Sequence, residues 1–493
     1  MRTALGMMLG AALLGGLYTG STWFMGREIE KVIGQQYSLV ATLPYLTIVQ
    51  RDYRRGVFCS QETATIELFG DTMRALASTQ AVSGSAVAVP ERLAVTIHTR
   101  IQHGPFPGLS RLAAAVGDSD VTVPDLPQEM RQAFGDKKPV ASQTVFRFDG
   151  GFSAFVHSPR AAVTLPPAPT GTAVSLLWEG FEGQIDAAPN LQQYTATGRT
   201  PRIELKEGNE TRMLFSDLRF EADQKRVYED EPFFYSGSQL FSIEEIRVEN
   251  AAAARPAVTL KQLRYGVEMP DSGDILDIAG RMGVEEICVA DQKWGPAHFD
   301  LAFRHLHART MADLYHTMLA MVPQAMEVAG PSPAGAAQVF AALLEPVRTL
   351  LAHQPELVID RLAVVGPAGE ARLAARVRLP GVTPEDLDEP AMLLAKLEAA
   401  GDAAVPEALL FGMADRGAGA ENAAGQQQEQ VRAQLAVFSE QGYITWEGGM
   451  IKVQAELKAG RLKLNGQPFP PAAPGPEEED LAGRPGGEGP SGP

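Results

Sequence analysis

Apolar and polar residues alternate with a period of two along much of this chain, and that pattern fits a β-strand with one buried face. In the first clear run, Leu93, Val95, Ile97 and Ile101 alternate with polar or small residues. Comparable runs cover residues 146–148, 263–269, 276–284, 299–303, 357–365, 373–379, 444–446, 451–457 and 462–464. Short turns such as the Asp-Gly-Gly sequence at 149–151 link neighbouring runs. The sequence therefore predicts an antiparallel meander.

Helical spacing of apolar residues interrupts this pattern in the second half of the chain. The spacing occurs at residues 311–322 and, after a Gly-Pro-Ser-Pro break, at residues 339–351. A Gln-rich segment at about residues 426–440 favours a third helix. We therefore expect a β-dominated α+β fold, with a long antiparallel sheet and several inserted helices. The pattern is compatible with an open, a curved or a closed sheet.

The N-terminal segment is uncharged from Thr3 to Phe24. As a helix it would rise about 33 Å, enough to cross a hydrocarbon core of about 30 Å. The apolar run ends in large residues, including Tyr18, Trp23 and Phe24, and lacks the small-residue pattern of a signal-peptide cleavage site. Such aromatic residues are typical of a membrane interface. The sequence thus predicts an uncleaved transmembrane helix over residues 1–26, followed by the long sheet.

Three further parts follow the anchor. A chain of 493 residues exceeds what one hydrophobic core usually organises. We expect a β-rich part at 27–305 and a mixed helix and strand part at 306–469. Residues 470–493 are mostly Pro, Gly and Glu, which cannot bury apolar surface, so a disordered tail is expected there.

Charge and cysteine content limit the partners of the chain. The formal net charge is −17 at pH 7, so the average surface repels the phosphates of nucleic acids and anionic lipids. Nucleic acid is therefore not expected as a partner. Cys59 and Cys288 form no C-x-x-C motif. They could pair in one long-range disulfide in an oxidising compartment or remain free thiols.

No residues carry a recognisable catalytic, cofactor-binding or metal-binding pattern. A G-x-S-x-G elbow, a phosphate-binding loop and a G-x-G-x-x-G motif opening a helix are absent from the sequence. One concentration of histidines comprises His298, His305, His307 and His316, without further ligands at metal-binding spacing. We interpret it as a polar strand face leading into a helix. The prediction is a protein that is not an enzyme and has no catalytic, cofactor or metal residues.

Two motifs, Tyr53 to Gln61 (YRRGVFCSQ) and His103 to Pro107 (HGPFP), carry a resemblance to a known family. Further matching segments are residues 18–20, 183–186, 442–444 and 462–466. With these motifs the chain resembles the YdgA-like envelope proteins of Gram-negative bacteria, which carry a domain of unknown function. The resemblance implies an inner-membrane protein with a single span, a cytoplasmic N-terminus and a periplasmic body. It supplies no reaction, and Cys59 stands where a small residue such as serine would be expected.

The motif residues themselves suggest turns rather than ligand contacts. Glycine tolerates a positive φ, and proline fixes its own φ. We therefore assign structural roles to Tyr53, Arg55, Gly56, Phe58, His103, Gly104 and Pro105.

The function expected from these observations is that of a non-enzymatic binding or scaffold protein of the cell envelope. The inner membrane, contacted through residues 3–24, and an envelope protein or lipid are the expected partners. A lipid-binding groove is the alternative, and the alternation at Phe299 to Phe303 is compatible with either an open apolar face or a buried core. A hydrolase built from distant strands is a further alternative. The glycine spacings Gly6-x-x-x-Gly10 and Gly16-x-x-x-Gly20 are compatible with a homodimer.

Overall fold

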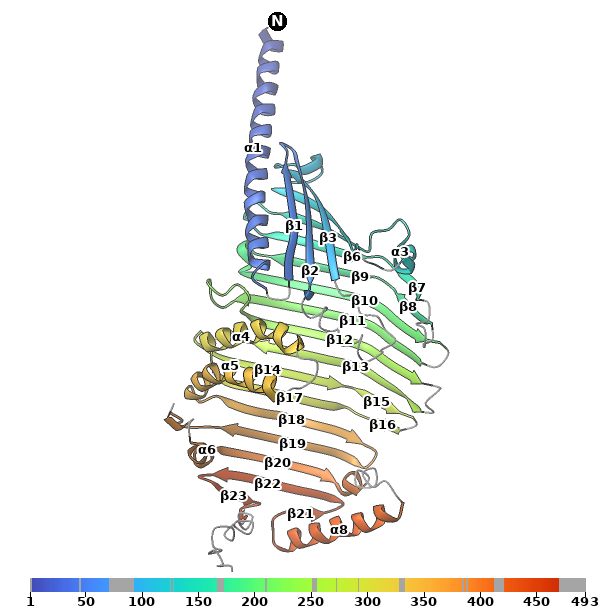
Figure 1. Ribbon diagram of the computed structural model, residues 1–493, viewed down its shortest axis with the longest axis vertical. Helices are drawn as coiled ribbons and strands as arrows, with labels where there is room; N and C mark the ends of the chain where they lie inside the picture. The colour runs from blue at the N-terminus through green and yellow to red at the C-terminus, as the bar shows by residue number, and fades with distance from the viewer. Residues whose placement is uncertain are drawn as a thin grey trace, which may run out of the picture.

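The computed structural model describes residues 2–43, 46–70, 93–124, 126, 128–165, 173–208, 211–250, 255–271, 273–290, 292–327, 333–383, 385–386, 389–411 and 421–469. Within these ranges, 24 strands form one sheet (Figure 1), and every pairing in it is antiparallel. The order of the strands in the sheet largely follows the chain. The predicted β-dominated fold with a long antiparallel meander and inserted helices is thereby confirmed. The proposed tail at 470–493 lies outside the described residues.

The strands of the first part include the longest ones. They are β1 (Leu46–Arg55), β2 (Cys59–Leu68), β3 (Leu93–His103), β4 (Ala115–Thr122), β5 (Val140–Phe146), β6 (Phe152–Ser158), β7 (Ala161–Leu165), β8 (Val174–Trp178), β9 (Phe181–Ala187), β10 (Gln193–Glu207), β11 (Thr211–Arg226), β12 (Tyr235–Asn250) and β13 (Arg255–Met269).

The strands of the second part continue the same sheet. They are β14 (Ile275–Val284), β15 (Glu286–Val289), β16 (Gln292–Trp294), β17 (Ala297–His307), β18 (Glu356–Gly366), β19 (Gly369–Arg378), β20 (Glu398–Pro406), β21 (Thr445–Glu447), β22 (Met450–Lys458), β23 (Arg461–Leu464) and β24 (Gln467–Pro468). β17 pairs with β18, so the sheet continues across the division that the sequence suggests near residue 305.

Local turn chemistry explains the hairpins that the sequence predicts. Between β5 and β6, Gly150 adopts a φ of 91° and the Asp149 carboxylate accepts a hydrogen bond from the Gly151 N–H at 2.8 Å. Between β18 and β19, Gly366 pairs with Gly369, which has a φ of 121°. Glycine reaches these left-handed conformations without steric cost. Both turns therefore hold the register of the strands on either side.

The helices are α1 (Arg2–Val40), α3 (Gln128–Phe134), α4 (Ala308–Glu327), α5 (Pro333–Ala352), α6 (Pro390–Lys396) and α8 (Glu421–Glu440). α4, α5 and α8 occur where helical spacing was expected. α1 is longer than expected, because its second half packs on the sheet. There Ile29 and Ile33 are buried with Ile101 and Phe146 in a core cluster that fixes the helix against β3 and β5.

A transmembrane anchor at residues 1–26 is not supported by the structure. Among the described residues, no helix has both the length and the apolar character needed to span a bilayer.

Candidate functional site: an open apolar face of the sheet

One row of large apolar side chains crosses the sheet from strand to strand. Residues paired directly across antiparallel strands point to the same face. By the register of the strands, the row comprises Phe220, Phe241, Tyr265, Met282, Phe299, Leu362, Leu373 and Ala403, on β11, β12, β13, β14, β17, β18, β19 and β20. We call the side of the sheet that carries this row the apolar face.

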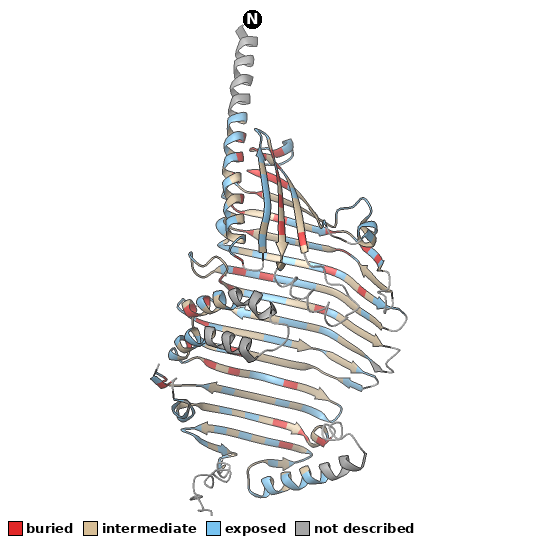
Figure 2. Ribbon diagram, viewed as in Figure 1, coloured by how far each residue is buried: buried red, intermediate tan, exposed pale blue. Residues whose placement is uncertain are grey.

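Much of the apolar face is open to solvent. Tyr265, Met282 and Leu362 are exposed by 48%, 41% and 42%, although they belong to the same row. Figure 2 shows intermediate and exposed residues along most of β13 to β22. An apolar row of this length would be covered by a second layer in an ordinary sandwich. Its exposure makes it the candidate functional surface of the described part of the chain.

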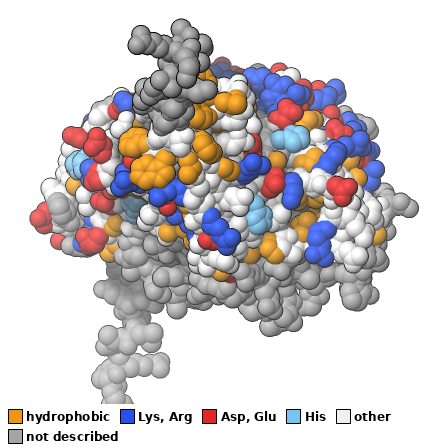
Figure 3. Space-filling view, turned by 90° about the horizontal axis from the view of Figure 1, so that it is seen from above, with side chains coloured by type: hydrophobic (Ala, Val, Ile, Leu, Met, Phe, Trp, Pro, Cys, Tyr) orange, Lys and Arg blue, Asp and Glu red, His pale blue; other side chains and the backbone are white. Residues whose placement is uncertain are grey.

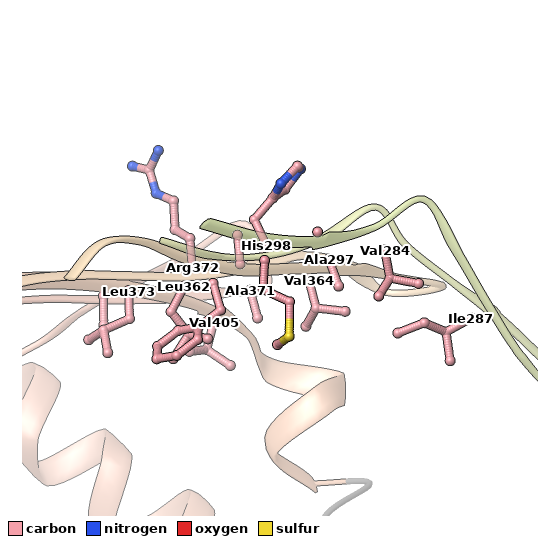
Figure 4. A pocket seen from close by; sticks show the side chains of 15 residues that line it. Val284, Ile287, Ala297, His298, Leu362, Val364, Ala371, Arg372, Leu373 and Val405 are labelled. Carbon is pink, nitrogen blue, oxygen red and sulfur yellow. The ribbon is translucent and has the colours of Figure 1, made fainter. Parts of the chain in front are cut away.

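A trough of about 540 Å³ lies on this face, at the ends of β14, β17, β18, β19 and β20. Its walls include Met282, Val284, Leu362, Leu373 and Val405. Two polar residues are also part of its boundary. Figure 4 shows that these two, His298 and Arg372, point to the opposite side of the sheet, away from the aliphatic side chains. The floor of the trough is therefore entirely apolar.

The opposite face of the same strands is polar. Arg281 pairs with Asp300 in register and forms an ion pair with Glu268 at 2.7 Å. Glu286 on β15 is held by Lys261 at 2.6 Å and by Lys293 at 3.3 Å. Hydrogen bonds from Lys261, Cys288 and Lys293 lower the pKa of Glu286 to about 2. The sheet therefore separates an apolar face from a charged one, and the charged groups do not reach the trough.

Helices α4 and α5 cover the other end of the apolar face. Leu276 on β14 is fully buried there with Leu306, Ala312 and Leu350. Figure 1 shows the two helices lying across one end of β14 and β17. β14 thus has a covered end at Leu276 and an open end at Met282. The trough is the part of the face that the helix pair leaves uncovered.

The motif residues of the sequence lie elsewhere, at the end of the sheet where α1 packs. His103 is only 2% exposed and its ring lies against Gly26 of α1, while Gly104 lies against Thr22. Burial lowers the pKa of His103, a backbone hydrogen bond to Val57 opposes the shift, and Arg55 adds to it. These contacts place His103 and Gly104 where α1 packs on the sheet, and the structural roles assigned to them stay a prediction.

The remaining motif residues lie at the same contact between α1 and the sheet. Arg55 forms an ion pair with Glu30 of α1 at 2.9 Å, and Phe58 stacks on Tyr18 with ring centroids 6.3 Å apart. The Gly56 N–H donates to the Cys59 carbonyl at 3.0 Å and closes the turn between β1 and β2. Pro105 accepts a backbone hydrogen bond from Ala113 at 3.2 Å.

Tyr53 lies beneath α1, beside a second and smaller cavity of about 280 Å³. Burial raises the pKa of Tyr53. The cavity is bounded by Tyr37 of α1 and by Glu62, whose carboxylate pairs with Arg51 at 2.7 Å. Burial and the charge of Glu62 raise the pKa of Tyr37 to about 12, although Arg51 opposes the shift. The cavity and the trough lie on the same face, because paired residues connect Glu62 to Phe220 across β2 to β11.

The predicted histidine concentration is dispersed. His298 points to the charged face, His307 stacks on His353 at 4.2 Å, and His316 contacts Glu231. Within the described part of the chain, no group of three or more His, Cys, Asp or Glu could hold a metal ion. Cys59 and Cys288 are both free thiols.

Sequence reasoning identified only part of the candidate surface. The alternation from Phe299 to Phe303 pointed to an apolar strand face, and Phe299 does line the trough. Sequence reasoning did not identify Leu362, Leu373 and Val405 as site residues, because the pattern of their strands is that of ordinary buried strands. The missing information is the register that aligns them with Phe299, together with the lack of a covering layer from the described residues.

A family model described as "Bacterial protein of unknown function (DUF945)" matches residues 1–472. No curated protein matches the chain, and neither does any solved structure. The resemblance to the narrower YdgA-like family stays a prediction.

Proposed function

The chain belongs to this bacterial family of unknown function, and from that premise we propose that it is a non-enzymatic protein that binds lipid acyl chains on its apolar face. The observation that carries the proposal is the composition of the trough. All side chains that face into it are apolar, and the two polar residues at its boundary point away.

This surface suits hydrocarbon better than a peptide. Inside the sheet, the backbone groups of β17, β18 and β19 are paired with neighbouring strands on both sides. A peptide laid on the trough would lose water from its own backbone groups without gaining hydrogen bonds. An acyl chain has no such groups, and each buried methylene contributes about 0.8 kcal/mol.

The length of the row also suits an extended chain. Neighbouring strands lie about 4.8 Å apart, so seven steps from Phe220 to Ala403 span about 34 Å. One leaflet of a bilayer allows an acyl chain about half of a 30 Å hydrocarbon core. The row is therefore longer than one acyl chain, and a bound chain could lie across several strands.

The location that we propose is the bacterial envelope, with α1 at the inner membrane and the sheet in the periplasm. The uncharged segment from Thr3 to Phe24 and the family resemblance support this part of the proposal. Protease added to spheroplasts would test it. Digestion of the sheet in intact spheroplasts agrees with the proposal, and digestion only after lysis contradicts it.

The binding function is tested with a photoactivatable fatty acid fed to cells that produce the full chain. After irradiation, mass spectrometry should find adducts on peptides from β14 and β17 to β19. Leu362→Glu places a charge in the trough and should lower the adduct yield about tenfold, equivalent to about 1.4 kcal/mol.

The matched control is Arg361→Glu, because Arg361 precedes Leu362 and pairs with Asp300 of the charged face. This variant should retain the adducts. Equal yields from the two variants, or adducts spread over both faces, would contradict acyl-chain binding in the trough. Crosslinks to a protein at the same peptides would identify a protein partner instead and would also overturn the proposal.

A further inference from the structure

Three segments meet at the end of the sheet where α1 packs, at a distance from the trough. They are residues 18–27 of α1, the β1–β2 turn at 55–59 and the β3–β4 loop at 103–114. The Tyr18 hydroxyl donates a hydrogen bond to the Phe106 carbonyl at 3.1 Å, and the same ring stacks on Phe58. One tyrosine thus joins all three segments.

Large apolar side chains on these segments project into solvent. The most exposed are Leu109 at 83%, Leu112 at 67% and Phe24 at 57%. We call the whole group the collar, and it comprises Trp23, Phe24, Val57, Phe58, Phe106, Leu109 and Leu112. Figure 3, seen from above, shows hydrophobic side chains gathered on this end of the molecule, with Lys and Arg side chains nearby.

The collar is held in place by the backbone. The His103 N–H donates to the Phe58 carbonyl at 2.9 Å, which fixes the loop to the turn. Leu109 adopts a φ of 58°, a conformation that is costly for a residue with a branched side chain. A strained and exposed leucine gains nothing from the packing of this chain.

The charge of this end differs from that of the whole chain. The chain has 60 acidic residues against 43 Lys and Arg. The collar segments at 18–27, 55–59 and 103–114 contain Arg27, Arg55 and Arg111 and no Asp or Glu, and Arg55 is paired with Glu30 of α1. With Glu30 counted, Arg27 and Arg111 still leave this end positively charged, so the repulsion of anionic lipids that the net charge of the whole chain predicts is weaker here. This end combines exposed apolar side chains with positive charge.

We propose that the collar inserts into the interfacial layer of an anionic lipid bilayer. Aromatic and leucine side chains would enter the boundary between headgroups and acyl chains, and Arg27 and Arg111 would contact anionic headgroups. The sequence of α1 favours a bilayer over a protein as the partner of the collar. The helix that passes through the collar carries the stretch from Thr3 to Phe24, which has no charged residue, so no ionised side chain of this stretch would have to enter lipid beside the collar.

The test uses the full chain with a single reactive cysteine, made in a Cys59→Ser and Cys288→Ser background. Leu109→Cys carries an environment-sensitive fluorophore in the collar, and Leu394→Cys, another exposed leucine, carries it on α6. Both proteins are reconstituted with vesicles of phosphatidylethanolamine and phosphatidylglycerol. Lipids with a spin label near the headgroup then quench any probe at the interface.

The proposal predicts a blue-shifted and quenched probe at residue 109 and a solvent-like probe at residue 394. Replacing phosphatidylglycerol by phosphatidylcholine should weaken vesicle binding at least about fivefold, as expected for loss of even one arginine contact. A probe at residue 109 that is as solvent-like as the probe at residue 394 overturns the proposal. Adducts of the photoactivatable fatty acid in the trough are a separate readout, so either proposal can fail while the other stands.

Discussion

The imidazole ring of His103 lies so close to Gly26 that the helix and the strand can meet only because residue 26 has no side chain. A Cβ atom at this position would overlap Nδ1 and Cε1 of the ring. Both residues are buried, so neither side of the contact can move into solvent. The contact fixes the distance between α1 and the edge of the β3–β4 loop, and it thereby fixes the collar.

Gly26→Ala should loosen the packing of α1 on the sheet. We expect the overlap with His103 to cost about 1–3 kcal/mol of stability, the usual range for overpacking. The matched control is Gly20→Ala on the same helix, where a Cβ would meet nothing within 4 Å. That change should be neutral or slightly stabilising, because alanine favours a helix. Hydrogen exchange of residues 22–40 measures the difference, and equal protection in the two variants would refute the contact.

His103 should make the stability of the protein depend on pH. Burial lowers its pKa below 6.5, so the unfolded chain binds a proton more readily than the folded one. The contribution of neutral, buried His103 to the free energy of unfolding is fully present above pH 6.5. It is lost as the pH falls below 6.5 and through the lower pKa of the folded protein. In His103→Gln, the free energy of unfolding should fall less between pH 7.5 and pH 5.5 than in the unmodified protein. Urea unfolding at the two pH values measures this difference.

The control for this measurement is His98→Gln, because His98 is an exposed histidine on the same strand. Its difference in unfolding free energy between the two pH values should resemble that of the unmodified protein. The same pH dependence in the His103 variant and the unmodified protein would show that His103 is not the buried titrating group.

The two ends of β14 should respond differently to truncation. Leu276→Ala removes a fully buried side chain beneath α4 and should cost about 2–5 kcal/mol. Met282→Ala removes an exposed side chain of the same strand and the same face, so its cost should stay below about 1 kcal/mol. Thermal unfolding of the two variants measures the difference. Comparable losses would mean that the face is covered at both ends.

Local chemistry explains which parts of this fold the sequence could predict. Alternation identified the strands around Leu93 and Phe299, and the Asp-Gly-Gly turn identified the hairpin of β5 and β6. The helical spacing that begins at Met311 identified α4. These signals lie within a few residues of one another, where periodicity and turn preference are reliable.

Two features could not be obtained in that way because they depend on contacts between distant segments. The register that aligns Tyr265, Met282 and Leu362 is set by successive pairings of several strands. The exposure of Leu362, which no described segment covers, cannot be deduced from its own strand. Similarly, the sequence indicated that Gly104 lies in a turn. It did not show that Thr22 of α1 packs directly against Gly104.

The most direct test of the account is photocrosslinking from the trough itself in living cells. A photoreactive benzoylphenylalanine replaces Leu362 in the full chain, or replaces Arg372, which points to the opposite face of the sheet. After irradiation, mass spectrometry of the purified chain identifies what is attached. The account predicts lipid adducts at position 362 and none at position 372. Protein adducts at position 362, or lipid adducts in equal amounts at both positions, would contradict it.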